Sequence, residues 1–64
     1  MYRLYVKWPK QKTFRPVNWR EGVQVRNLIH ATLFTAEESV KLTDELISNA
    51  GMNPGMEWEL RPCS

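Results

Sequence analysis

The chain has very few of the side chains on which protein chemistry most often depends. Its 64 residues include one cysteine, Cys63, and one histidine, His30. Small secreted domains usually depend on several disulfides, so a lone cysteine indicates a reducing compartment, and we expect a cytoplasmic protein. A Cys–His nucleophile needs the thiol held beside the base in a protected site, and Cys63, near the end of the sequence, is poorly placed for that role.

Motifs that hold metals or phosphates are also missing. The sequence contains no Cys-x-x-Cys or His-x-x-x-His pair and no Asp-rich loop, so it lacks the spaced ligands of a metal site. The glycines, which would have to cluster to form a phosphate-binding loop, are isolated from one another: Gly22, Gly51 and Gly55. These absences predict a protein that is not an enzyme and carries no metal and no cofactor.

Glu57 and Glu59 are the one carboxylate pair that has the spacing of an acid–base site. They fall on one face of a predicted strand, roughly 7 Å apart by strand geometry. The simpler interpretation is that they are solvated, or that they pair across strands with Arg3 and Lys7. We therefore expect a structural role for both.

Long apolar segments are absent as well. No apolar run approaches the roughly 20 residues that cross a bilayer or the about 7–15 residues of a signal-peptide core, so we expect no membrane contact. A hydrophobic fraction of 42% with three Trp, two Tyr and two Phe is nevertheless globular composition. A chain of this length buries only about 60% of the surface that its unfolded form exposes, which predicts a single domain, residues 1–64, with one thin core.

The first strand is predicted over residues 2–8. Apolar residues alternate there with basic and aromatic ones in the period of two that a half-buried strand requires: Tyr2, Leu4, Val6 and Trp8 against Arg3, Tyr5 and Lys7. Pro9 ends this strand, and a polar turn leads to residues 14–17. Because Pro16 has no backbone N–H, this second segment is predicted to be a short edge strand or an irregular arm of a hairpin.

The stretch from residue 18 to residue 34 fits two patterns. Its apolar residues suit one helical stripe, and Asn18 and Glu21 have the spacing of a capping box. Against a helix, Gly22 would fall in the first turn, and Val, Ile, Thr and Phe favour strands. We predict a turn at residues 18–21 and a strand over residues 25–34, while the choice between strand and part helix for residues 19–34 stays open.

A helix is predicted over residues 36–50. Thr35 and Glu38 form a capping box at its start, and Gly51 stands where a left-handed residue closes a helix. At about 100° per residue, one side of this helix is apolar and is expected to face the sheet. Its residues are Ala36, Ser39, Val40, Leu42, Thr43, Leu46, Ile47 and Ala50.

A last strand completes the predicted fold. Asn53, Pro54 and Gly55 fit a type II turn in which the glycine supplies a positive φ, and alternation over residues 56–61 follows until Pro62. The fold class is α/β (α+β), a β-β-β-α-β domain with one amphipathic helix packed on one face of a three- to four-stranded sheet. The expected sheet core is Leu4, Val6, Trp8, Ile29, Ala31, Leu33, Trp58 and Leu60. The other sheet face stays open, and we expect function there.

Charge is unevenly distributed along the chain. Residues 1–34 hold seven Lys or Arg and one Glu, a net +6, whereas residues 35–64 hold two and six acidic residues, a net −4. The basic half predicts a candidate face for nucleic acid or another partner: Arg3, Tyr5, Lys7, Lys10, Lys12, Arg15, Arg20 and Arg26. The cations would contact phosphates and Tyr5 would stack on a base. Pairing with Glu57 and Glu59 is the competing interpretation, because it would neutralise part of this face.

Three segments resemble the amino-terminal arm-binding domains of some tyrosine recombinases. They are Tyr5-Val6-Lys7-Trp8, Thr13-Phe14-Arg15 and the run from Ala31 to Glu38. The resemblance implies a three-stranded sheet placed against DNA with a helix behind it. This chain departs from that pattern in its fourth strand and its acidic helix.

Protein recognition is the favoured function, with nucleic-acid binding as the alternative. Leu28 and Phe34 point outward if the third strand pairs as predicted, and with Tyr5 they would form an apolar strip for a partner or a second copy. The alternative is a bulge near Asn27, which would return Leu28 to the core. The helix adds a candidate acidic docking face: Glu37, Glu38, Asp44 and Glu45. The sequence therefore predicts a small non-catalytic binding module that recognises an unknown protein or itself. Its size suggests an adaptor or inhibitor of phage or mobile-element type.

Overall fold

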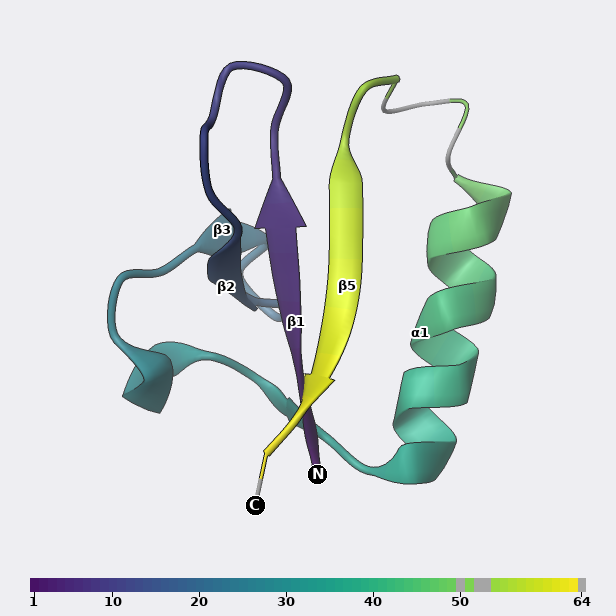
Figure 1. Cartoon of the computed structure of the whole chain (residues 1–64). Helices are drawn as coiled ribbons and strands as arrows, with labels where there is room; N and C mark the ends of the chain where they lie inside the picture. The colour runs from purple at the N-terminus through teal and green to yellow at the C-terminus, as the bar shows by residue number, and fades with distance from the viewer. Residues whose placement is uncertain (50, 52–53, 64) are drawn as a thin grey trace.

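The structure is a computed structural model that describes residues 1–49, 51 and 54–63. In Figure 1 a long helix stands beside a curled sheet. The elements are β1 (Tyr2–Lys7), β2 (Arg15–Asn18), β3 (Val23–Gln24), a short 3₁₀ helix η1 (Leu28–His30), β4 (Leu33–Phe34), α1 (Ala36–Ser48) and β5 (Glu57–Pro62). The predicted α+β class, with one helix packed on a small antiparallel sheet, is confirmed.

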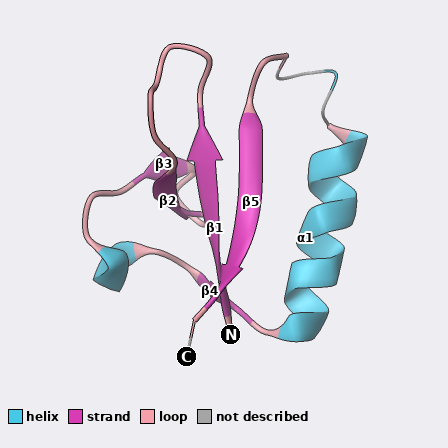
Figure 2. Cartoon of the chain, in the orientation of Figure 1, coloured by secondary structure: helices cyan, strands magenta, loops and turns pink. Residues whose placement is uncertain are grey.

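β1 is the central strand of the sheet. β5 pairs with β1 along its whole length, from Tyr2 opposite Pro62 to Lys7 opposite Glu57. The other edge of β1 is shared: β4 pairs with its first half and β2 with its second half. β3 then pairs with β2, and all of these pairings are antiparallel (Figure 2).

β2 lies between two neighbours, so the prediction of an edge strand was wrong. Pro16 stands opposite Tyr5 of β1, and its carbonyl accepts a hydrogen bond of 2.8 Å from Val25 N–H. Only alternate pairs of an antiparallel ladder exchange hydrogen bonds. Pro16 and Tyr5 form a pair that exchanges no hydrogen bonds. The missing N–H of Pro16 therefore removes no hydrogen bond between β1 and β2.

The core lies between the helix and the even-numbered side chains of β1. Leu4 is fully buried, with 0% of its surface exposed. It belongs to one hydrophobic cluster that joins sheet and helix: Leu4, Val6, Val17, Phe34, Leu42 and Leu46, with Tyr2, Met56, Trp58 and Leu60 packed against it. The sequence placed Leu4, Val6, Trp58 and Leu60 in this core correctly.

The predicted strand over residues 25–34 is replaced by two short pieces around a 3₁₀ helix. The Asn27 side chain accepts a hydrogen bond of 3.1 Å from Ile29 N–H and caps η1. Thr32 then fixes the segment to the end of β2: its N–H donates to Val17 O over 3.1 Å, and its hydroxyl accepts from Trp19 N–H over 2.8 Å. Local capping and these side-chain bonds override the strand preference of Val and Ile.

This break also reverses several predicted orientations. Phe34 is buried opposite Tyr2, on the helix side of the sheet, and does not point outward. Ile29 is 79% exposed because it lies on η1, outside the sheet. Leu33 and Trp8, both expected in the core, are exposed as well. Ala31 is buried as predicted.

α1 begins where the capping box predicts. The Thr35 hydroxyl accepts a hydrogen bond from Glu38 N–H over 3.2 Å, and the Glu38 carboxylate accepts one from Thr35 N–H over 2.9 Å. The buried stripe is narrower than predicted, because it contains only Ser39, Leu42 and Leu46.

Two helix residues expected in the core lie outside it. Val40 and Ile47 are each 63% exposed. They lie at the border of the buried stripe, so the sheet that covers Leu42 and Leu46 does not reach them.

The end of α1 differs from the prediction. The helix ends at Ser48 and is capped by Asn49, whose backbone N–H and side-chain amide both donate to Glu45 O, over 3.0 and 2.9 Å. Gly51 does not have a positive φ, so it is not the left-handed cap that we expected. Ala50, the predicted last residue of the helix, lies outside the described residues.

Gly55 is the glycine whose conformation matters to the turn before β5. Its φ is +84°, as the predicted turn requires, and a Cβ at this position would lie 2.7 Å from Cγ of Pro9. Gly55 therefore permits both the turn and a close approach to the end of β1. Asn53, the first residue of the predicted turn, lies outside the described residues.

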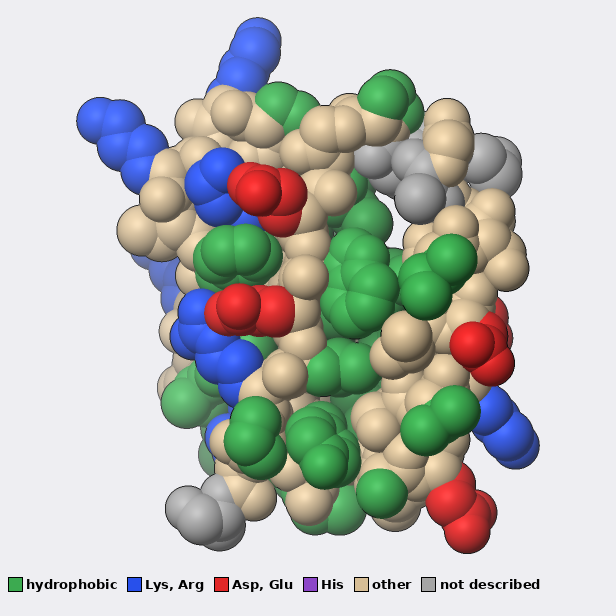
Figure 3. Space-filling model, turned by 45° about the vertical axis from the view of Figure 1, so that its right-hand side comes forward, with side chains coloured by type: hydrophobic (Ala, Val, Ile, Leu, Met, Phe, Trp, Pro, Cys, Tyr) green, Lys and Arg blue, Asp and Glu red, His purple; other side chains and the backbone are tan. Residues whose placement is uncertain are grey.

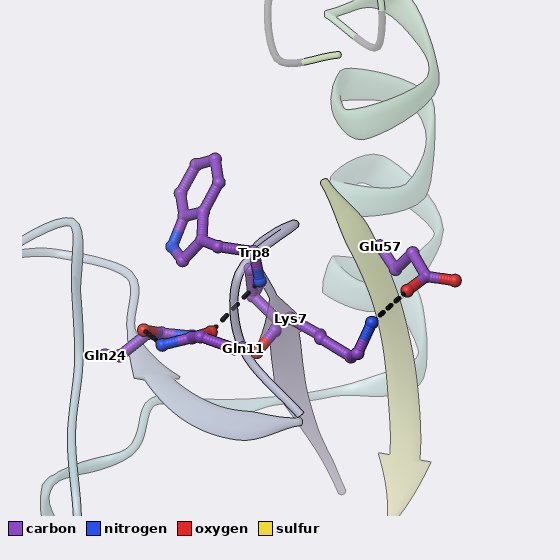
Figure 4. Close-up of polar contacts among 6 residues, drawn as sticks. Lys7, Trp8, Gln11, Gln24 and Glu57 are labelled. Carbon is purple, nitrogen blue, oxygen red and sulfur yellow. Dashed lines mark hydrogen bonds and ion pairs between the residues drawn. The ribbon is translucent and has the colours of Figure 1, made fainter. Parts of the chain in front are cut away.

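The β1–β2 turn is fixed to β3 by a reciprocal pair of amides (Figure 4). Gln11 and Gln24 each donate to the other's side-chain oxygen, over 2.7 and 2.8 Å. Gln24 also donates to Val6 O over 2.9 Å, and Gln11 accepts from Trp8 N–H over 3.0 Å. Side-chain hydrogen bonds therefore connect the β1–β2 turn, β3 and β1 at the point where the short backbone pairing of β3 ends.

Candidate protein-binding site

The sheet face opposite the helix carries a ladder of charges that neutralise one another. Lys7 of β1 stands opposite Glu57 of β5, and Nζ of Lys7 is 2.8 Å from Oε2 of Glu57 (Figure 4). Arg61 forms an ion pair with Glu59 on the same strand. The predicted pairing of a glutamate with Lys7 is found at Glu57, whereas Glu59 pairs with Arg61 of its own strand and not with Arg3.

Tyr5 is covered and is not free to stack on a base. The guanidinium carbon of Arg61 lies 4.0 Å from the centroid of its ring and 5.9 Å from that of Phe14. Arg3 stands opposite Arg61, and its Nε is buried without a hydrogen-bond partner among the described residues. Lys7 and Tyr5 are therefore engaged within the fold, whereas Arg3 forms no ion pair with a described residue.

The other predicted cations lie on the β1–β2 turn and beyond β2: Lys10, Lys12, Arg15, Arg20 and Arg26. All five are exposed, and none forms an ion pair with a described residue. Arg15 and Arg26 line one shallow hollow of about 310 Å³ together with Pro16 and Val25. The structure thus separates the predicted basic face into a neutralised part and a free part.

The predicted acidic face lies along α1, where Glu37, Asp44 and Glu45 are exposed. Glu38 differs from these residues, because its carboxylate accepts the backbone hydrogen bond of the capping box. The hydrogen bond from Thr35 N–H, together with a second one from the Thr35 side chain, holds the pKa of Glu38 below its ordinary value of 4.5. Its carboxylate is therefore ionised at neutral pH but already bonded to the backbone.

An apolar cavity of about 310 Å³ opens near the carboxyl end of α1. Leu4, Val6 and Leu46 form part of its lining, and Trp8, Trp19 and Val23 are exposed residues beside them. The polar residues of the lining are Gln24, Glu45 and Asn49. Gln24 and Asn49 already hydrogen-bond within the chain, so the cavity offers an apolar surface with few polar groups to orient a ligand.

The outer edge of β5 is the surface that the sequence did not reveal. Within residues 1–49, 51 and 54–63, β5 pairs with β1 alone. Figures 1 and 3 show α1 next to β5, with hydrophobic side chains gathered between the two elements. We call the outer backbone groups of Trp58, Leu60 and Pro62 the free edge.

The ladder itself shows which backbone groups point outward. Cys63 N–H donates to Met1 O over 2.8 Å, so the odd-numbered residues of β5 direct their backbone groups at β1, because bonded pairs alternate. The even-numbered residues Trp58 and Leu60 therefore direct N–H and C=O away from the sheet. Pro62, which has no N–H, occupies the next outward position, where proline is tolerated.

Apolar side chains flank the free edge. Trp58 and Leu60 point to the helix side and are only partly buried against the core. Val40 and Ile47 are the strongly exposed hydrophobic residues of α1, and Figure 3 shows exposed hydrophobic side chains of the helix facing β5. The edge thus combines unpaired backbone groups with a hydrophobic border.

The described residues contain no cluster of potential metal ligands. No three His, Cys, Asp or Glu side chains gather in that part of the chain. His30 is exposed on η1, and Sγ of Cys63 donates to Met1 O over 3.2 Å. The structure, as far as it is described, also contains no helix with the length and apolar character needed to cross a membrane.

Comparison with known proteins gives no family. No protein-family model, no curated protein and no solved structure matches this chain. The resemblance to recombinase arm-binding domains therefore gains no support from these comparisons.

Proposed function

We propose that this chain is a non-catalytic protein-interaction module that binds an extended protein segment as an added strand at the free edge of β5. The observation that carries this proposal is the outward N–H and C=O of Trp58 and Leu60, whose apolar side chains are only partly buried against the core. Strand addition takes its affinity from main-chain hydrogen bonds and its specificity from pockets beside alternate side chains.

The other surfaces support this choice over the open sheet face. Lys7, Arg61, Glu57 and Glu59 on that face are already in ion pairs, and Tyr5 is covered by Arg61. A partner there would have to break these contacts, whereas a strand at β5 would satisfy backbone groups that pair with no described residue. A long, unprotected edge is also the part of a sheet most prone to pair with another chain.

The test compares two substitutions at one outward position. Leu60→Pro removes the outward N–H, while Leu60→Ala loses the same side-chain packing and keeps the N–H. Short random peptides displayed on phage are selected on the wild-type protein, and the selected peptide is titrated by NMR. The wild-type and Leu60→Ala proteins should bind, with shifts at Trp58 and Leu60, and Leu60→Pro should not.

The fold provides the check on that comparison. Because the Leu60 N–H points away from β1, Leu60→Pro should stay folded and melt near Leu60→Ala. Equal peptide binding by the two variants, or shifts confined to other elements, would show that the edge is not the binding site.

Nucleic-acid binding is the second candidate function, and the surface proposed for it differs from the one that the sequence predicted. The observation in its favour is the group of free cations around the β1–β2 turn and Arg26, not the ladder that contains Tyr5. Affinity for a random oligonucleotide should fall with salt, and Lys10→Ala should lower the log–log slope by about one unit. Tyr5→Ala should leave this binding unchanged, because its ring is covered. Anisotropy that shows no binding at low salt removes this candidate.

A further inference from the structure

The sequence of β5 is complementary to itself about Leu60. A second copy approaching this edge antiparallel would be related by a two-fold axis, in which each surface meets the same surface of its partner. Leu60 is flanked by one acidic residue, Glu59, and one basic residue, Arg61, whose side chains share a face. A two-fold axis at Leu60 therefore places Glu59 of each copy opposite Arg61 of the other.

Backbone geometry restricts the possible registers. Only Trp58, Leu60 and Pro62 direct backbone groups outward, so hydrogen-bonded pairs must join even-numbered residues of the two copies. An axis between two residues would oppose even with odd positions and is excluded. The axis must then pass through one residue of the strand.

Charge selects one of the remaining registers. An axis at Glu57, Glu59 or Arg61 opposes that residue with the same residue of the second copy, although the axis at Glu59 also places Glu57 opposite Arg61. An axis at Pro62 opposes no two charges and joins two residues that have no N–H. An axis at Trp58 opposes Glu57 and Glu59. The axis at Leu60 opposes only unlike charges, and opposite charges at facing positions favour pairing whereas like charges disfavour it.

The apolar side of the strand fits the same register. Leu60 meets Leu60 of the second copy, and Trp58 lies opposite Pro62. Leu60 N–H donates to the opposite Leu60 C=O in both directions, and Trp58 N–H donates to the opposite Pro62 C=O. The missing N–H of Pro62 leaves only the Trp58 C=O without a donor in this ladder. The added strand also covers the apolar border formed with α1.

We infer that the strand accepted by β5 is β5 of a second copy, paired antiparallel about Leu60 with reciprocal Glu59–Arg61 contacts. This inference rests on the proposed function and names its partner. The resulting sheet is continuous across the two copies, with both helices on one side and both charge ladders on the other.

Charge reversal tests the register through sedimentation equilibrium of the whole chain. Glu59→Arg opposes two Arg pairs and Arg61→Glu opposes two Glu pairs, so each variant should dimerise at least about tenfold more weakly than wild type. An equimolar mixture of the two restores unlike charges at every facing position. The mixture should regain dimer with near wild-type affinity, as a heterodimer.

Glu57→Arg is the matched control. It makes the same charge change on the same strand and face, but in this register residue 57 meets Cys63 and no charge, so its dimer should persist. Circular dichroism melts identify any variant that fails to fold.

The outcomes separate the inference from the proposed function. A wild-type protein that stays monomeric to millimolar concentration, or a mixture that stays monomeric, overturns the Leu60-centred dimer. If the phage-selected peptide still shifts Trp58 and Leu60 in that protein, strand addition at β5 survives with a different partner.

Discussion

Thr35 and Glu38 show how two side chains set the start of α1. Each accepts a hydrogen bond from the other's backbone N–H, which satisfies two donors that a helix start leaves without partners. Both residues are exposed, so their contribution comes from capping and not from burial. Their spacing alone predicted this motif.

Replacing Thr35 by Ala should lower the free energy of unfolding by about 0.5–2 kcal/mol. The hydroxyl that accepts from Glu38 N–H is lost, and the helix start is left to water. Urea denaturation followed by circular dichroism measures the change. Thr35→Ser, which keeps the hydroxyl, should lose much less, and equal losses in the two variants would argue against capping.

Glu38 should make stability depend on pH. Its pKa is lower in the folded chain than its ordinary value of 4.5, so the unfolded chain takes up the proton first as pH falls. The contribution is therefore present above about pH 4.5 and is lost as pH falls through the folded pKa. Comparing melting temperatures of wild type and Glu38→Gln from pH 7 to pH 3 isolates it. The wild-type advantage should shrink toward pH 3, and a constant difference would contradict this account.

Among the elements, those governed by local rules could be predicted and those governed by pairing could not. β1 and β5 follow from strict alternation, and α1 follows from its capping box. Residues 25–34 contain strand-forming residues, but β2 and β4 must share one edge of β1, and no sequence pattern states how that edge is divided. The free edge of β5 was missed for the same reason, because sheet order is not local. Pro62 at an outward position was its only signal.

A matched pair of substitutions tests the corrected helix face. Leu42 is buried between helix and sheet, whereas Ile47, expected in the core, is 63% exposed. Leu42→Ala should cost about 2–5 kcal/mol of stability, and Ile47→Ala about 0.5 kcal/mol or less. Denaturation of dilute protein measures both without the influence of self-association. A larger loss at Ile47 than at Leu42 would restore the original assignment of the face.

At the scale of the whole molecule, the surface contains one region of paired charges, one region of unpaired cations and the free edge of β5. The open sheet face is held together by Lys7–Glu57 and by Arg61 with Glu59 and Tyr5. The cations near the β1–β2 turn remain free of ion pairs with described residues. The sequence revealed the charges, but which of them were neutralised depended on the register of β5 against β1.

The exchange of individual backbone amides tests the free edge most directly. In dilute protein, the amides of Trp58 and Leu60 should exchange quickly, while those of Glu59 and Arg61, bonded to β1, should be protected. At high concentration, or with the phage-selected peptide, Trp58 and Leu60 should become protected too, and hydrogen exchange read by NMR resolves each residue. Protection of Trp58 and Leu60 in dilute protein, or rapid exchange of both under every condition, would contradict strand addition at β5.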